Sequence, residues 1–147
     1  MFKVSNVSHI IYPVTDVDKS VHFLTNVLGF YLQRRGQATY VGIGETLLEL
    51  VGMQGAVASY VDAVRRIADP QGVERPTVYV FGLVVDNLDE AIRDLEAKGV
   101  EVVRPIWNAR TFWGRQAVIK DPGGQQIALR EYRAPDGPHF EDWHPEN

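Results

Sequence analysis

The sequence predicts an α+β fold built from two tandem βαβββ units. Three observations lead to this prediction: a segment that occurs twice, an apolar pattern of helical spacing that continues from each copy, and strand-like runs before and after each expected helix. A chain of 147 residues with 45% apolar and 23% charged residues has the size and composition of one globular domain. We therefore expect residues 1–147 to form a single domain.

The repeated segment is Val14–Val21, which lies over Val85–Ile92 at a constant offset, since 85 − 14 and 92 − 21 both give 71. In each copy a capping residue, Thr15 or Asp86, is followed three residues later by an aspartate. Such residues accept hydrogen bonds from the free N–H groups of a first helical turn. Each copy is therefore expected to begin a helix.

Apolar residues continue at helical spacing behind both expected caps. Gly29 closes the first pattern and Gly99 closes the second, and glycine is the usual residue just past a helix C-terminus. Two amphipathic helices of similar length follow from this.

Strand-like runs surround both helices. They are expected at His9–Val14, Phe30–Arg34, Thr39–Ile43, Thr46–Val51, Val78–Val85, Val100–Val103, Gln116–Ile119 and Gln126–Glu131. The first unit is then expected at residues 5–53 and the second at 77–132, joined by a linker at 54–76 with a helix at 56–68. Residues 133–147 lack periodicity and are expected to form a C-terminal tail.

Composition narrows the functional classes. The net charge is −4 and the basic residues are scattered, so nucleic acid is not an expected partner. The chain has no cysteine, which excludes disulfides and thiolate chemistry. No apolar run approaches the roughly 20 residues that span a bilayer. The N-terminus carries no signal-peptide pattern, and a cytoplasmic location is expected.

Two motifs frame the duplicated unit. His9 opens the pattern His-x-x-x-x-Val-x-Asp-x-Asp, and Trp113-Gly114 leads into the turn Asp121-Pro122-Gly123-Gly124. With these motifs in this order, residues 5–132 resemble the vicinal oxygen chelate superfamily, which includes glyoxalases, bleomycin-resistance proteins and extradiol dioxygenases. The resemblance implies an open, cup-shaped mixed sheet with helices outside, a small-molecule site on the concave face, and a homodimer.

The resemblance also implies four positions for metal ligands, two from each unit. His9 and Glu49 match the two positions of the first unit. The offset of 71 places the counterpart of His9 at Val80, and the spacing of the turn glycines places that of Glu49 at Ala128. Neither of these side chains binds metal, so we expect no metal or other cofactor. A divalent Zn, Ni, Mn or Fe ion would need further ligands beside His9 and Glu49.

His9 and Glu49 are also the candidate catalytic residues. As a hydrogen-bonded pair they could move a proton on a bound substrate, because histidine titrates near neutrality and a carboxylate can orient it or act as the base. The alternative is that both are inherited polar residues satisfied by their neighbours.

Arg130 is a candidate substrate-binding residue. Strand alternation places it on the same face as Ala128. A guanidinium there could hold a carboxylate or phosphate, while the alternative is a rim arginine paired with solvent or with Glu131.

Further candidates for ligand binding are Tyr40 on a first-unit strand and Trp113 and Arg115 near a second-unit loop, where Trp107 and Phe112 are also expected. Aromatic residues at the mouth of a cup could stack on a flat ligand. They could equally serve the core or a dimer interface.

Two functional classes follow. The first is a binding protein of the bleomycin-resistance type, which takes up a small aromatic or anionic molecule in a cup without a complete metal site. The second is an enzyme of the same superfamily, a lyase, isomerase or dioxygenase that uses His9 and Glu49. Loss of two ligands favours the first class, and retention of the other two favours the second.

Overall fold

A computed structural model describes residues 1–52, 79, 81–109 and 112–132. The chain divides into two compact units, unit 1 (Met1–Tyr60) and unit 2 (Val61–Asn147), and each is described by itself. The helix expected at 56–68, the rest of the linker, and the tail at 133–147 lie outside the described residues.

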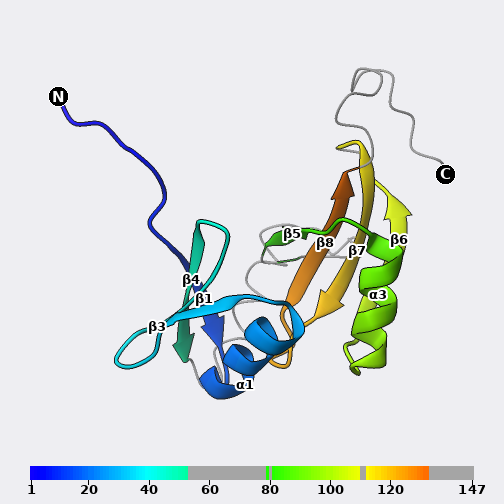
Figure 1. The fold of residues 1–147 in the computed structure, drawn as a ribbon, viewed down its shortest axis with the longest axis horizontal. Helices are drawn as coiled ribbons and strands as arrows, with labels where there is room; N and C mark the ends of the chain where they lie inside the picture. Colours follow the sequence, from blue (N-terminus) through cyan, green and yellow to red (C-terminus); the bar gives the residue numbers. More distant parts are fainter. Residues whose placement is uncertain (53–78, 80, 110–111, 133–147) are drawn as a thin grey trace, which may run out of the picture. The chain divides into compact units, whose positions relative to one another are not determined.

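The described residues of unit 1 form one helical region and a four-stranded sheet (Figure 1). Its elements are β1 (Ile10–Val14), α1 (Val17–His22), a π-helical turn η1 (Phe23–Val27), β2 (Tyr31–Arg34), β3 (Thr39–Ile43) and β4 (Thr46–Gly52). The strand order is β1-β4-β3-β2, with β1 parallel to β4 and the other pairs antiparallel.

Unit 2 repeats this topology. Its elements are β5 (Gly82–Val84), α3 (Leu88–Ala97), β6 (Val102–Asn108), β7 (Gly114–Lys120) and β8 (Gln126–Tyr132). The order is β5-β8-β7-β6, again with one parallel pair, β5 and β8. The α+β class and the tandem βαβββ arrangement expected from the sequence are confirmed.

Each sheet has one face that packs on its own helix. In β8, Ile127 and Leu129 are 0% and 1% exposed, and the next residue of this face, Glu131, binds the first residue of α3. In β4, Leu48 and Leu50 take the matching positions and are buried. Because strand residues alternate, Glu49 and the even-numbered residues of β8 lie on the opposite side. We call this side of each sheet, turned away from its own helix, the distal face.

The helix starts lie one residue later than expected in both units. Asp16 caps α1 by accepting a hydrogen bond from the Lys19 N–H at 3.0 Å, and Asn87 caps α3 by accepting one from the Glu90 N–H at 3.0 Å. The expected cap Thr15 is wrong by one position, as is its counterpart Asp86, because the extended backbone that a cap needs occurs at the following residue.

The helical region of unit 1 holds one residue more than that of unit 2. From Asp16 to Gly29 there are 29 − 16 = 13 steps, and from Asn87 to Gly99 there are 99 − 87 = 12. Both glycines have a φ of 79°, so the two regions end in the same way. The π-helical turn η1, which has no counterpart in α3, accommodates the additional residue.

Strand β6 is longer than the pattern predicted. It continues past Val103 to Asn108 and includes Trp107, which was expected in a loop. Two register shifts interrupt its pairing with β7, so its residues do not alternate in a regular way. Pro105 is tolerated because β6 is an edge strand.

The described helices are too short and too polar to pass through a bilayer.

Candidate functional site

The distal face of unit 1 carries a histidine–carboxylate pair. Glu49 lies in the middle of β4, where it pairs with Ile11 of β1, and His9 lies two residues before Ile11 on the same side. His9 Nε2 is 3.1 Å from Glu49 Oε2, and the two side chains are 35% and 24% exposed. The structure thus brings together the two candidate catalytic residues, and solvent or a ligand can reach both.

Two neighbours orient the imidazole. Ser8 Oγ lies 2.9 Å from His9 Nδ1, and the ring of Tyr40, which pairs with Glu49 in the ladder, stands edge-on to the imidazole at 5.8 Å and 87°. When the Nε2–H of a neutral His9 donates a hydrogen bond to Glu49, Nδ1 carries no proton and accepts one from the Ser8 hydroxyl. This arrangement can exchange a proton between imidazole and carboxylate, which is the chemistry of a general acid–base pair.

Unit 2 has no such pair on the matching strand. Gly82 pairs with Ala128 in the parallel ladder of β5 and β8, as Ile11 pairs with Glu49 in that of β1 and β4. Ala128 therefore holds in unit 2 the position that Glu49 holds in unit 1, and it is fully buried. Val80, the counterpart of His9, lies outside the described residues.

Arg130 is the centre of the polar contacts on the distal face of unit 2. Its Nε donates to Gln116 Oε1 at 2.7 Å and its Nη2 donates to the hydroxyl of Tyr79 at 2.8 Å. The guanidinium carbon lies 4.3 Å from the centre of the Phe112 ring. Burial lowers the pKa of Arg130, but hydrogen bonds to Tyr132 and Tyr79 outweigh it and leave the pKa above its ordinary value. Arg130 is thus a permanent, partly buried cation.

The sequence did not point to Gln116 and Tyr79 as partners of Arg130. Gln116 is 5% exposed. A glutamine in an otherwise apolar strand is a signal that could have suggested this partner, because a buried polar side chain needs a hydrogen bond. Tyr79 is remote in sequence and precedes its strand, so no local pattern connects it with Arg130. The expected alternative partner Glu131 faces the other side of the sheet.

Arg115 lies on the helix side of unit 2. It binds Glu131 at 3.0 and 3.1 Å and Asp89 at 2.7 Å, while Glu131 also accepts the Leu88 N–H at 2.8 Å. Hydrogen bonds to Glu131 and Asp89 hold the pKa of Arg115 above its ordinary value. These contacts tie β7 and β8 to the start of α3, and they turn Arg115 away from Arg130. Trp113, directly before β7, is half-buried.

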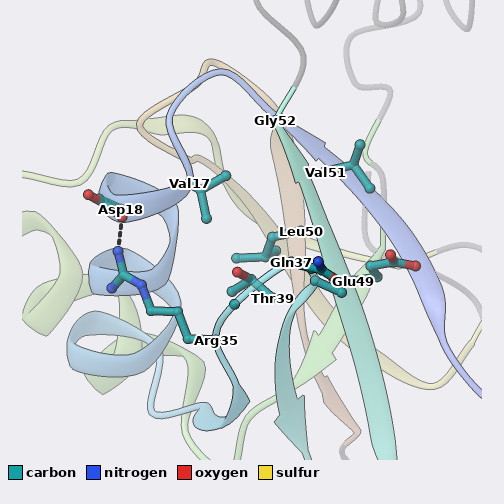
Figure 2. Close-up of a pocket in the computed structure, with 11 residues that line it drawn as sticks. Val17, Asp18, Arg35, Gln37, Thr39, Glu49, Leu50, Val51 and Gly52 are labelled. Carbon is teal, nitrogen blue, oxygen red and sulfur yellow. Dashed lines mark hydrogen bonds and ion pairs between the residues drawn. The ribbon is translucent and has the colours of Figure 1, made fainter.

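Unit 1 also contains an open pocket of about 520 Å³ on its helix side. Its wall is formed by Val17, Asp18, Arg35, Gly36, Gln37, Ala38, Thr39, Glu49, Leu50, Val51 and Gly52. Figure 2 shows an ion pair between Asp18 and Arg35 beside it, and the carboxylate of Glu49 pointing away from that pair. Glu49 thus lines this pocket and also meets His9 on the distal face.

A divalent metal does not fit the donors that the described residues offer. In that part of the chain no three His, Cys, Asp or Glu residues gather to hold an ion. His9 and Glu49 supply one nitrogen and one carboxylate, and they bind each other. Zinc sites use three or four protein ligands, and hard cations need about six donors in total.

The fold and the duplicated ladder define a class of protein. A family model described as Glyoxalase/Bleomycin resistance protein/Dioxygenase superfamily matches residues 6–129, and the chain belongs to this superfamily. This confirms the family that the sequence motifs indicated. No curated protein sequence matches the chain.

Several solved structures share the fold. UcmS2 is 25% identical with a TM-score of 0.63, and the match covers 88% of this chain and 99% of that one. TnmS3, an antibiotic binding protein from a Streptomyces species, is 24% identical with a TM-score of 0.64, over 90% and 100% of the two chains. The fosfomycin resistance protein FosX from Listeria monocytogenes is 19% identical with a TM-score of 0.63, over 89% and 96%.

Proposed function

We propose that this protein binds a small aromatic or anionic organic molecule, and that Arg130 holds the anionic group. The observation that carries the proposal is a partly buried guanidinium whose hydrogen bonds go to neutral groups, Gln116 and Tyr79. Among the described residues no carboxylate pairs with Arg130. A partly buried charge is stabilised by a partner of opposite sign, and a ligand carboxylate can supply it.

The ring of Phe112 supports the aromatic part of the proposal. It lies under the Arg130 guanidinium, so a planar anion that binds the guanidinium edge comes close to an aromatic surface. Trp113 is proposed as a further contact of this ligand, and Tyr40 as a ligand contact on unit 1. The fold serves a comparable task in TnmS3, an antibiotic binding protein, although shared fold alone does not fix function. The contacts of Arg115 favour a structural role for that residue.

The test uses biphenyl-4-carboxylate as the anionic probe and biphenyl-4-methanol as the neutral probe of similar shape. We expect calorimetry to show tighter binding of the carboxylate, and a loss of at least about tenfold in the Arg130→Gln variant. Binding of the neutral probe should change little. Arg93→Gln, at an exposed arginine of α3, is the matched control. Equal binding of the carboxylate by wild type and Arg130→Gln would refute the assignment.

A second function is favoured by the distance of 3.1 Å between His9 and Glu49. In this alternative the protein is an enzyme of the lyase, isomerase or dioxygenase type. Glu49 would accept a proton from the bound substrate and His9 would return one, or both would join a divalent-metal site completed by other ligands.

The metal content of protein purified without chelator separates these versions. Zn, Ni, Mn and Fe would be measured in wild type, His9→Ala and Glu49→Ala. A stoichiometric metal that is lost in both variants would support a rebuilt metal site. Protein that stays free of metal after these ions are added would support a metal-free acid–base pair or a binding protein.

We also propose that the two units and their linker form one domain, and that the protein acts as a homodimer in the cytoplasm. Light scattering during size-exclusion chromatography checks the dimer, since a monomer at all concentrations would contradict it.

A further inference from the structure

A second arginine on the distal face of unit 2 carries an inference of its own. Arg104 of β6 pairs with Val118 of β7, which in turn pairs with Ala128 of β8. Residues directly opposite each other in a ladder share a face, so Arg104 lies on the face of Ala128 and Arg130. The register shifts of β6 concealed this placement from the sequence pattern.

The guanidinium of Arg104 is held by a ring. Its central carbon lies 3.7 Å from the centre of the Trp107 ring, and both side chains are half-buried. A guanidinium stacked on a ring uses its flat face for that contact and keeps its N–H donors at the edge. Among the described residues, no hydrogen bond or ion pair of the Arg104 side chain is present to occupy those donors. Arg104 is therefore oriented without being neutralised.

The two guanidinium groups lie near opposite ends of one row of paired residues in the sheet. Trp107 pairs with Gln116, and Gln116 pairs with Arg130, so these three side chains stand side by side across β6, β7 and β8. Neighbouring strands are roughly 4.8 Å apart, which places the ends of the row at a separation of about 10 Å. Each end of the row combines a guanidinium with an aromatic ring: Arg104 with Trp107, and Arg130 with Phe112.

The charge of this row contrasts with the rest of the protein. Neither Arg104 nor Arg130 has a carboxylate partner among the described residues. A general excess of basic residues does not explain this, because the chain has a net charge of −4. On the other side of the same sheet, Arg115 is paired with Glu131 and Asp89. Within the described sheet of unit 2, the two arginines without a carboxylate partner, Arg104 and Arg130, both lie on the distal face.

We propose that Arg104 and Trp107 form a second anion subsite, and that the ligand of unit 2 is an elongated aromatic molecule with an anionic group at each end. This inference rests on the proposed function, because Arg130 supplies the first anion subsite. Each arginine would bind one carboxylate through two parallel N–H donors, and the aromatic body would bridge the two half-buried guanidinium groups above the buried Gln116.

The test compares biphenyl-4,4′-dicarboxylate with biphenyl-4-carboxylate. In wild type we expect the dicarboxylate, with its charges at opposite ends, to bind at least about tenfold more tightly. Biphenyl-2,2′-dicarboxylate, which has the same charge on adjacent positions, should show no such gain. Arg104→Gln should abolish the gain, so that the dicarboxylate binds this variant no more tightly than the monocarboxylate does. Arg104→Lys, which keeps the charge but loses the planar group, should retain part of it.

The outcomes separate this inference from the proposed function. A dicarboxylate that binds no better than the monocarboxylate, or a gain that survives in Arg104→Gln, would overturn the second subsite while Arg130 could still anchor the monocarboxylate. Failure of wild type to bind the monocarboxylate would overturn the proposed function itself. Thermal melts of Arg104→Gln and of the control Arg93→Gln would show whether a loss reflects unfolding.

Discussion

The two units share a scaffold but differ in the chemistry of their distal faces. Both have one parallel and two antiparallel strand pairs, an N-cap at an offset of 71 and a glycine with a φ of 79° behind the helix. Unit 1 places on its distal face a histidine and a carboxylate that satisfy each other, and unit 2 places there two arginines that stack on rings.

This difference shows which positions hold the scaffold. The helix side of each sheet is filled with buried apolar residues, so a change there alters the packing that stabilises the unit. The distal positions do not hold the helix. They can differ between the units, as Glu49 and Ala128 do, while the ladder stays the same.

The largest expected loss of stability comes from replacing a glycine by alanine, and its size depends on which atoms lie beside the added Cβ. A Cβ on Gly114, which has a φ of 151°, would lie 2.0 Å from the backbone oxygen of Glu131. Neither strand can move without breaking the ladder, so Gly114→Ala should cost about 4 kcal/mol of unfolding free energy or prevent folding. A Cβ on Gly42 would lie 2.4 Å from the ring of Tyr31. That ring is 47% exposed and can turn away, so Gly42→Ala should cost about 1 kcal/mol.

Thermal denaturation followed by circular dichroism checks this pair of variants. Gly36→Ala is the control, because nothing lies within 4 Å of the added carbon. If Gly42→Ala destabilised the protein as much as Gly114→Ala, the contrast between a movable ring and a fixed backbone would be wrong.

A smaller loss of stability is expected when a carboxylate of either unit is replaced by an amide. Glu131 has a side chain that is 11% exposed and it binds both Arg115 and the Leu88 N–H, so Glu131→Gln should cost about 2–3 kcal/mol. The Glu49 side chain is 24% exposed and does not hold a helix, so Glu49→Gln should cost less than about 1 kcal/mol. Urea denaturation measures both values. Similar losses in the two variants would mean that His9 and Glu49 also hold the fold together.

The smallest expected effects concern the caps. Asp16→Ala and Asn87→Ala should each cost about 1 kcal/mol, because each removes the acceptor of a first-turn N–H. Thr15→Ala and Asp86→Ala, one residue earlier, should change stability by less than about 0.5 kcal/mol. Greater losses in the second pair, measured in the same denaturation experiments, would move the helix starts back to the positions that the sequence pattern suggested.

Much of the fold follows from the sequence because its signals are local. The repeat at an offset of 71, the glycines behind each helix and the short strand runs are each contained in a few consecutive residues. Local propensity therefore determines the number, order and type of the elements. The resemblance to the superfamily also implied that His9 and Glu49 share one site, and the parallel ladder of β1 and β4 brings the two side chains together.

Only the tertiary structure decides what the remaining side chains meet. Arg115 and Arg130 look alike in sequence, yet one faces two carboxylates and the other a glutamine, a tyrosine and a ring. Arg104 joins the distal face only because β6 is bulged. A partner across a sheet depends on register and on bulges, and both are set by packing of distant segments against each other. The chain by itself thus determines the scaffold, and the long-range pairing of strands determines which charges remain unpaired on it.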